Sequence, residues 1–381
     1  MQPHILLLIF LTFSSSILAQ TAATLQHAGE TREYLYYLPS SYDESQQYPL
    51  MITFHGGAGT MEDQTYLFST ELAEQENFIV VYPQALPDPN DGNSTVWSLV
   101  NSGTLPYTFE NPHDDIGFVS ELIDEMVANH SVDIERVYAC GFSNGGGFSF
   151  DLSCRLSEKI AAVGVVARSM YVETHDECNY THPMPTITIN GTDDFYEGIT
   201  YEGVLYFLGY NSLNEFLASS VNASLEPTIT PMPDLDSSDG STVELQQWDG
   251  GDNCISIEHY KVINGGHSWP GSYWSNQDID ASQVIWDYVS QYNLNGLIDC
   301  SSNVEDQSIE TLTIYPNPAT NQTTFSWDSS LGSQALQIYD LSGRVVANIN
   351  KIQNSTLIKL DLESGVYIVV CEEFTSKLVI K

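Results

Sequence analysis

The sequence predicts an α/β domain with a mainly parallel sheet, followed by a small all-β sandwich. Over residues 20–293, short apolar runs that are typical of buried parallel strands alternate with stretches of helical periodicity. Residues 294–308 are polar and lack periodicity, which indicates a linker. From residue 309 to 381 the pattern changes to short alternating strands separated by turn residues. Two folded units of unequal size are therefore expected.

The main elements of the first domain can be placed from this alternation. One helix is expected around residues 119–127, where apolar residues recur at helical spacing after Asp114-Asp115, which suits an N-cap. Another is expected over residues 148–156, and a last one over residues 282–292. The buried strands are expected at residues 50–54, 78–82, 137–140 and 186–189.

The first 19 residues predict a secretory signal peptide. An apolar stretch over residues 5–13 gives way to small residues, with a plausible cleavage site after Ala19, although no Lys or Arg precedes the apolar stretch. A transmembrane anchor needs about 20 apolar residues, roughly twice what this stretch offers, so export is favoured.

The charge balance is strongly acidic. The chain has 11 Lys and Arg against 50 Asp and Glu, a formal net charge of −39, and only 6 of those basic residues precede residue 307. Such a surface repels nucleic acid and acidic membranes, which excludes them as partners. Solubility in a salty medium explains the charge better than an acidic site for a cationic substrate.

Six cysteines in an exported chain favour disulfide bonds. Cys154 and Cys178 flank one strand-like segment and are the expected pair. Cys140 lies in an apolar strand next to the serine motif described below and is expected to be a buried free thiol. The sequence leaves open whether Cys254 pairs with Cys300.

A nucleophile motif, Gly141-Phe142-Ser143-Asn144-Gly145, lies between a predicted strand and a predicted helix. A sharp turn at that point pushes the serine hydroxyl out of the sheet, and the flanking glycines relieve the crowding. The pattern alone is common, but its place between strand and helix points to Ser143 as a nucleophile.

A serine hydroxyl needs a base and an orienting acid, which follow such a turn in the order acid, then histidine. Asp194 lies in a loop after the strand at residues 186–189, with Asp193 as the alternative. His267 lies in the turn-rich loop after the strand-like residues 260–263. These positions predict Asp194 as the acid and His267 as the base.

Acyl transfer also needs two N–H donors that face the developing oxyanion. The backbone of Asn144 is one, and the glycine-rich loop at residues 55–59 supplies the other, assigned to Gly57 with Ala58 as the alternative. This loop lacks the lysine and the spacing of a phosphate-binding loop. No metal or cofactor is required by this chemistry.

Together these blocks resemble the polyhydroxybutyrate depolymerase and feruloyl esterase group of α/β-hydrolases, which includes acetylxylan esterases. The resemblance spans nearly all of the first domain and implies the α/β-hydrolase fold, serine esterase activity, and a substrate cleft lined by Trp269. The matching segments lie at residues 55–57, 114–118, 136–146, 191–194 and 265–271.

Two features depart from the group. Asn190 stands where the group commonly has histidine before Gly-Thr. The group also often pairs a cysteine near Cys254 with one in the helix around residues 216–222, where this chain has none. Substrate preference is therefore open for the lid-like, aromatic-rich residues 195–210, whose rings suit either a substrate cleft or a core.

The second domain resembles the C-terminal sorting domain of type IX secretion cargo. The resemblance implies a partnership with the type IX secretion machinery, and an extracellular or surface-attached protein after removal of the signal peptide and tail. It rests on four blocks, Tyr315-Pro316-Asn317-Pro318-Ala319, residues 338–344, Gly365-Val366-Tyr367 and residues 377–381, with strands expected at 311–315, 334–339, 365–370 and 377–380.

The expected function is hydrolysis of carboxylic esters through an acyl-enzyme. Polysaccharide esters of the feruloyl or acetyl type are weakly favoured as substrates, and a polyester of the polyhydroxybutyrate type is the alternative. A peptidase of the same fold ranks lower. A hypothesis outside the enzymes is a non-catalytic surface binding protein on a hydrolase fold. Loss of the expected serine, acid or histidine would support it, and none of the three is lost.

Overall fold

The computed structural model describes residues 20–90, 92–98, 112–194, 206–300, 312–327, 333–340, 343–353, 355–371 and 374–381. The chain divides into two compact units, Met1–Cys300 and Ser301–Lys381. The predicted signal peptide and residues 301–308 of the predicted linker lie outside the described residues. Within those residues, no helix is both long and apolar enough to span a bilayer.

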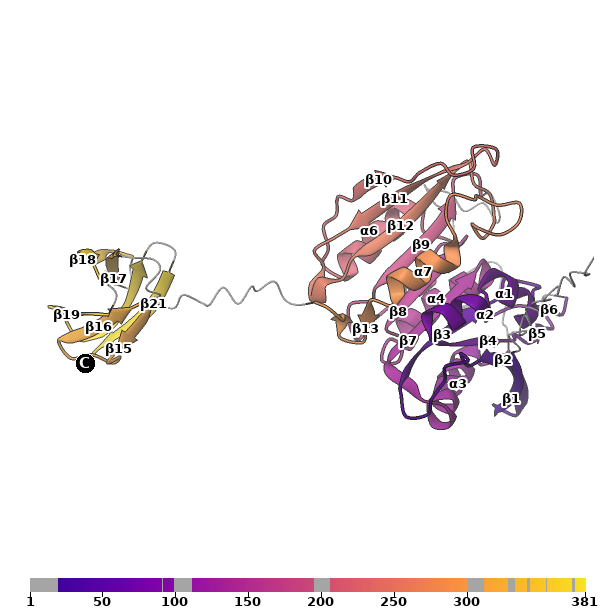
Figure 1. Ribbon diagram of the computed structural model, residues 1–381, viewed down its shortest axis with the longest axis horizontal. Helices are drawn as coiled ribbons and strands as arrows, with labels where there is room; N and C mark the ends of the chain where they lie inside the picture. Colours follow the sequence, from indigo (N-terminus) through magenta and orange to yellow (C-terminus); the bar gives the residue numbers. More distant parts are fainter. Residues whose placement is uncertain are drawn as a thin grey trace, which may run out of the picture. The chain divides into compact units, whose positions relative to one another are not determined.

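A twisted ten-stranded sheet forms the centre of the first unit (Figure 1). Six central strands are parallel in the order β4, β3, β7, β8, β9, β12, and two antiparallel strands extend each edge. The strands are β1 (Thr21–His27), β2 (Glu30–Tyr37), β3 (Tyr48–Phe54), β4 (Ile79–Pro83), β7 (Val132–Phe142), β8 (Ala162–Val166), β9 (Thr186–Gly191), β10 (Thr228–Pro231), β11 (Thr242–Trp248) and β12 (Ile257–Ile263).

Helices cover both faces of this sheet. In β3, Leu50 and Ile52 join one buried cluster and Met51 the other, because alternate strand residues point to opposite faces. The first cluster includes residues of α3 and α4, and the second includes residues of α1, α2, α6 and α7. The helices are α1 (Met61–Leu67), α2 (Thr70–Glu76), α3 (Asp115–Asn129), α4 (Asn144–Arg155), α5 (Val172–Glu177), α6 (Tyr210–Ser220) and α7 (Ala281–Val289), with a short 3-10 turn η2 (Asp252–Cys254).

The four predicted strands correspond to β3, β4, β7 and β9, and the three predicted helices to α3, α4 and α7. The prediction of a mainly parallel sheet is confirmed. Asp114 is the N-cap of α3, since its side chain accepts a hydrogen bond from the Gly117 amide over 2.9 Å. Asp115, the other half of the predicted cap, is buried and has a different partner, described below.

Residues 294–300, which the sequence assigned to the linker, belong to the first unit. Strand β13 (Tyr292–Asn293) pairs with β14 (Gly296–Leu297), and Cys300 forms a disulfide bond with Cys254. This bond settles the pairing that the sequence left open. In place of a cysteine in α6, hydrogen bonds tie the end of that helix to η2, one from the Asn222 side chain to Asp252 over 2.6 Å.

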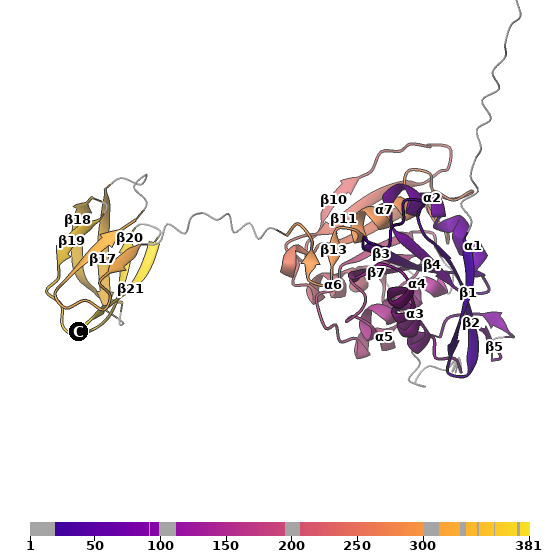
Figure 2. The same ribbon diagram turned by 60° about the horizontal axis from the view of Figure 1, so that its bottom comes forward.

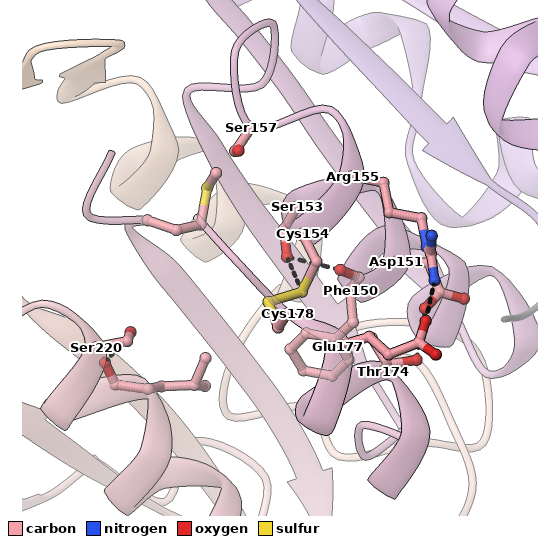
Figure 3. Close-up of a disulfide and its surroundings, with 12 residues drawn as sticks. Phe150, Asp151, Ser153, Cys154, Arg155, Ser157, Thr174, Glu177, Cys178 and Ser220 are labelled. Carbon is pink, nitrogen blue, oxygen red and sulfur yellow. Dashed lines mark hydrogen bonds and ion pairs between the residues drawn. A yellow bond between two sulfur atoms is a disulfide. The ribbon is translucent and has the colours of Figure 1, made fainter. Parts of the chain in front are cut away.

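The expected disulfide between Cys154 and Cys178 is present and joins α4 to α5 (Figure 3). Beside it, the guanidinium group of Arg155 lies 2.8 Å from the Glu177 carboxylate. Cys140 is a buried free thiol, as predicted, and burial raises its pKa to about 12. A thiol in that environment stays protonated and is not a nucleophile.

The second unit is an all-β sandwich, in agreement with the prediction (Figure 2). One sheet has the order β15, β16, β19 and the other β18, β17, β20, β21, and apolar residues from both form one buried core. The strands are β15 (Thr313–Tyr315), β16 (Gln322–Ser326), β17 (Gln334–Asp340), β18 (Val345–Ile352), β19 (Thr356–Lys359), β20 (Gly365–Cys371) and β21 (Phe374–Ile380).

Candidate active site

Ser143 occupies a strained turn between β7 and α4. Its φ of 53° and ψ of −118° lie in a region that L-residues rarely adopt, and its amide donates to the Val166 carbonyl over 2.9 Å. The turn requires its glycines, because a Cβ on Gly145 would lie 2.3 Å from the carbonyl oxygen of Phe54. A Cβ on Gly141 would likewise lie 2.4 Å from the Gly145 backbone. The local sequence therefore fixes the sharp corner on which the hydroxyl stands.

The structure brings Ser143, His267 and Asp194 into one hydrogen-bonded chain. A carboxylate only accepts hydrogen bonds, so Nδ1 of His267 donates to Asp194 Oδ2 over 2.9 Å. Its Nε2 is then the acceptor for the Ser143 hydroxyl, 3.0 Å away. The carboxylate is 2% exposed, while the imidazole keeps 23% of its surface accessible. The imidazole is thus accessible to another molecule and the carboxylate is not.

Asp194 and His267 meet because β9 and β12 are adjacent and parallel, so their following loops share one edge of the sheet. The loops are tied by a bond from the Asp193 amide to the Gly265 carbonyl over 2.9 Å. A Cβ on Gly191 would lie 2.1 Å from that same carbonyl. Asp193, the alternative acid, is exposed, and its carboxylate accepts a hydrogen bond from Thr192.

The glycine-rich loop after β3 lies against the start of α4. The amide of Ala58 donates to the Thr95 carbonyl over 2.9 Å, so this alternative oxyanion donor is already engaged. A Cβ built on Gly57 would lie 3.7 Å from the Cβ of Asn144, which makes these two residues neighbours. Asn144 is the first residue of α4, where amide groups have no partner within the helix.

Trp97 and His55, two residues without an assigned role in the sequence analysis, hold this loop in place. The Trp97 amide donates to the side-chain oxygen of Asn144 over 2.7 Å, and its indole N–H donates to the His55 carbonyl over 3.0 Å. The His55 ring donates from Nδ1 to Gly56 and accepts from the Ala85 amide at Nε2. Burial lowers the pKa of His55, so the ring stays neutral and can accept that bond.

A buried ion pair supports the same region from the edge of the sheet. Nη2 of Arg32 lies 2.6 Å from Oδ1 of Asp115, and both side chains are fully buried. The other carboxylate oxygen accepts the Ser98 amide over 2.7 Å, one residue after Trp97. The guanidinium group also lies 4.0 Å above the ring of Phe118. Asp115 therefore fixes the segment that reaches both Asn144 and the glycine-rich loop.

Trp269, expected to line the substrate cleft, is only 2% exposed. Its indole N–H donates to the Ser282 hydroxyl over 3.1 Å, and its ring lies edge-on to Phe142. The side chain packs beneath the histidine loop because its polar atom finds a buried partner there. Among the aromatic residues 195–210, Phe207 and Tyr210 are buried in the core, while residues 195–205 lie outside the described part of the chain.

The strand order and the strained serine turn define the first unit as an α/β-hydrolase domain. Residues 32–185 match the protein-family model described as "Esterase PHB depolymerase", and residues 313–381 match "Secretion system C-terminal sorting domain". Both resemblances seen in the sequence are confirmed. With its sorting domain, the protein is located outside the cell or on its surface.

Curated relatives agree with the esterase family. A bifunctional acetylxylan esterase/xylanase of Neocallimastix patriciarum is 30% identical over 279 residues, covering 72% of this chain and 35% of the relative. Feruloyl esterase B of Piromyces equi is 26% identical over 276 residues, which cover 69% of this chain and 46% of the relative. The chain thus spans less than half the length of these two relatives. A solved acetyl xylan esterase from Aspergillus awamori is 14% identical with a TM-score of 0.47, covering 71% of this chain and 99% of that one.

Proposed function

We propose that this protein is a secreted serine carboxylic-ester hydrolase that works through an acyl-enzyme. The observation that carries the proposal is the hydrogen-bonded chain from Ser143 through His267 to Asp194 at 3.0 and 2.9 Å. Each residue has the environment that its role needs: a strained corner for the nucleophile, an accessible base, and a buried acid that fixes the histidine tautomer.

The reaction proceeds in two steps with one proton carrier. His267 Nε2 takes the proton of Ser143 as its Oγ attacks the ester carbonyl carbon, and the amides of Asn144 and Gly57 stabilise the oxyanion. The carbon–oxygen bond to the alcohol then breaks, and the alcohol leaves with the proton from His267. Water, deprotonated by the same nitrogen, attacks the acyl-enzyme, releasing the acid and restoring Ser143.

The proposed substrates are feruloyl or acetyl esters on a polysaccharide. The relatives named for acetylxylan and feruloyl ester hydrolysis support this choice. The family description names a polyhydroxybutyrate depolymerase, so a polyester is the second candidate.

The test compares the purified full chain with Ser143→Ala on 4-nitrophenyl acetate, methyl ferulate, acetylated xylan and polyhydroxybutyrate. Hydrolysis by the wild type that is lost in the variant supports the proposal, and the preferred ester selects the substrate class. A folded wild type that hydrolyses none of them and does not react with a fluorophosphonate probe would refute it in favour of a binding protein.

The orienting acid has a matched control in its neighbour. Asp194→Asn should lower kcat by about 10⁴-fold, because the amide no longer holds the histidine tautomer. Asp193→Asn should change kcat less than about twofold, since this side chain is exposed and bonds only to its neighbour Thr192 among the hydrogen bonds of the described residues. Equal losses in both variants would contradict the assignment.

A further inference from the structure

Two exposed aromatic side chains follow the histidine loop. Tyr273 is 82% exposed and Trp274 is 88% exposed, and their rings contact each other edge-on with centroids 4.5 Å apart. Trp274 also has a φ of 68°, a left-handed conformation that is costly for a bulky residue. A large ring held in water on strained backbone indicates a contact surface for another molecule.

The loop that carries these rings is well ordered by its own hydrogen bonds. The Gly271 amide donates to the Asn276 carbonyl over 2.8 Å, and the side chain of Gln277 donates to the Ser272 carbonyl over the same distance. Asn276 is buried and donates to Ser241. The backbone that carries the two rings is therefore held by these bonds, so little backbone entropy is lost when a ligand binds.

A hollow of about 250 Å³ lies beside this loop, between it and helices α1 and α2. Tyr66, which is 84% exposed, stands on its α1 wall, and Ser272 stands on the loop wall directly before Tyr273. Its lining includes oxygen acceptors such as the Glu71 carboxylate, and Asp280, whose carboxylate caps α7, also lines it. Ser69 also lines it, and its hydroxyl makes no capping bond to α2.

The hollow is close to the catalytic histidine. Trp269 forms part of its lining and lies edge-on to Phe142 with ring centroids 6.4 Å apart. Phe142 in turn lies 5.0 Å from the ring of His267. Two aromatic side chains, Trp269 and Phe142, thus separate the hollow from the base, which places the hollow beside the catalytic centre rather than within it.

We propose that Tyr273 and Trp274, together with the hollow that Tyr66 and Ser272 line, bind the chain of a neutral polysaccharide whose ester group is hydrolysed at Ser143. This inference rests on the proposed function. Sugar rings offer C–H faces that pack on aromatic rings and hydroxyl groups that donate to acceptors such as Glu71. A polyester chain has no donors along its length and would desolvate the Glu71 carboxylate without offering it a hydrogen bond. The net charge of −39 repels anionic polymers.

The test uses the full chain carrying Tyr273→Ala and Trp274→Ala together, with Tyr315→Ala as the control, an aromatic of the second unit that is 76% exposed. Affinity electrophoresis through gels that contain xylan measures binding, and kcat/KM is measured on acetylated xylan and on 4-nitrophenyl acetate. The double variant should no longer be retarded by xylan in the gel, and its kcat/KM on acetylated xylan should fall about tenfold. Its kcat/KM on 4-nitrophenyl acetate should change less than about twofold. The control should match the wild type.

Unchanged retardation and unchanged hydrolysis of acetylated xylan in the double variant would overturn the inference. It would equally be overturned if the aromatic pair governed adsorption to polyhydroxybutyrate or to cationic chitosan but not to xylan, or if its removal only abolished a dimer seen by size-exclusion chromatography. Failure of the proposed function is separate, since it appears as absent hydrolysis of 4-nitrophenyl acetate by the wild type, while xylan binding is measured without catalysis.

Discussion

Replacing Asp115 with alanine should destabilise the first unit far more than the removal of an exposed ion pair. The variant leaves the guanidinium group of Arg32 fully buried without its carboxylate, 2.6 Å away in the wild type, and removes the acceptor of the Ser98 amide. Breaking a buried pair in this way costs about 3–5 kcal/mol. That is a large part of the roughly 5–15 kcal/mol by which domains are stable.

The matched control is Glu177→Ala, which removes the partner of Arg155 in a pair whose side chains are 50% and 38% exposed. An exposed pair contributes about 0–1 kcal/mol. In urea unfolding followed by tryptophan fluorescence, an m-value of about 3 kcal/mol/M turns the Asp115 effect into a midpoint shift of ~1–1.7 M. The control should shift the midpoint by less than ~0.3 M.

The same variant should lower kcat, because Ser98 adjoins the residue that holds Asn144 and the glycine-rich loop. Replacing both partners, Arg32→Met with Asp115→Leu, should recover much of the lost stability, since no unpaired charge remains. If Asp115→Ala shifts the urea midpoint no more than Glu177→Ala does, the buried pair does not support the site as argued.

Three further outcomes are expected. Gly145→Ala should prevent folding of the first unit, since the added Cβ would clash with the Phe54 carbonyl. At Gly266 an added Cβ would meet no atom within 4 Å, so Gly266→Ala should leave the thermal midpoint nearly unchanged. Cys300→Ser should cost about 4 kcal/mol in urea unfolding, because the bond to Cys254 closes a 46-residue separation; an unchanged midpoint would refute this. Burial lowers the pKa of His259 to about 3. Below about pH 6.5 only the unfolded state gains this proton, so the free energy of unfolding should fall by about 1.4 kcal/mol for each pH unit. An unchanged free energy of unfolding between pH 7 and 5 would contradict this.

Much of the first unit could be predicted because its signals are local. Strands β3 and β4 and the second half of β7 are nearly continuous apolar runs with both faces buried, and the helices repeat apolar residues every three or four positions. The sheet edges gave weaker signals: β10 is exposed at every residue, and β1 is exposed at alternate positions over much of its length. In the second unit β16, β18 and β19 were missed for the same reason, since their patterns hold few buried positions.

The hydrogen-bonded set of Ser143, Asp194 and His267 could be predicted from the order of these residues and from the ends of the strands they follow. The sequence could not decide between Asp194 and Asp193, or between Gly57 and Ala58, because both members of each pair lie in the same loop. Burial favours Asp194 over the exposed Asp193. The hydrogen bond from the Ala58 amide to the Thr95 carbonyl favours Gly57 over Ala58.

The sequence by itself determined the two folded units, the serine turn and the order of the proposed catalytic residues, because glycines, apolar periodicity and strand-end loops act over a few neighbouring positions. Only the tertiary structure decided that Trp269 is buried, that Cys254 bonds to Cys300, and that Asp115 pairs with Arg32. Those outcomes depend on which distant segments the sheet brings together, and burial and pairing are properties of that assembled neighbourhood rather than of any local run of residues.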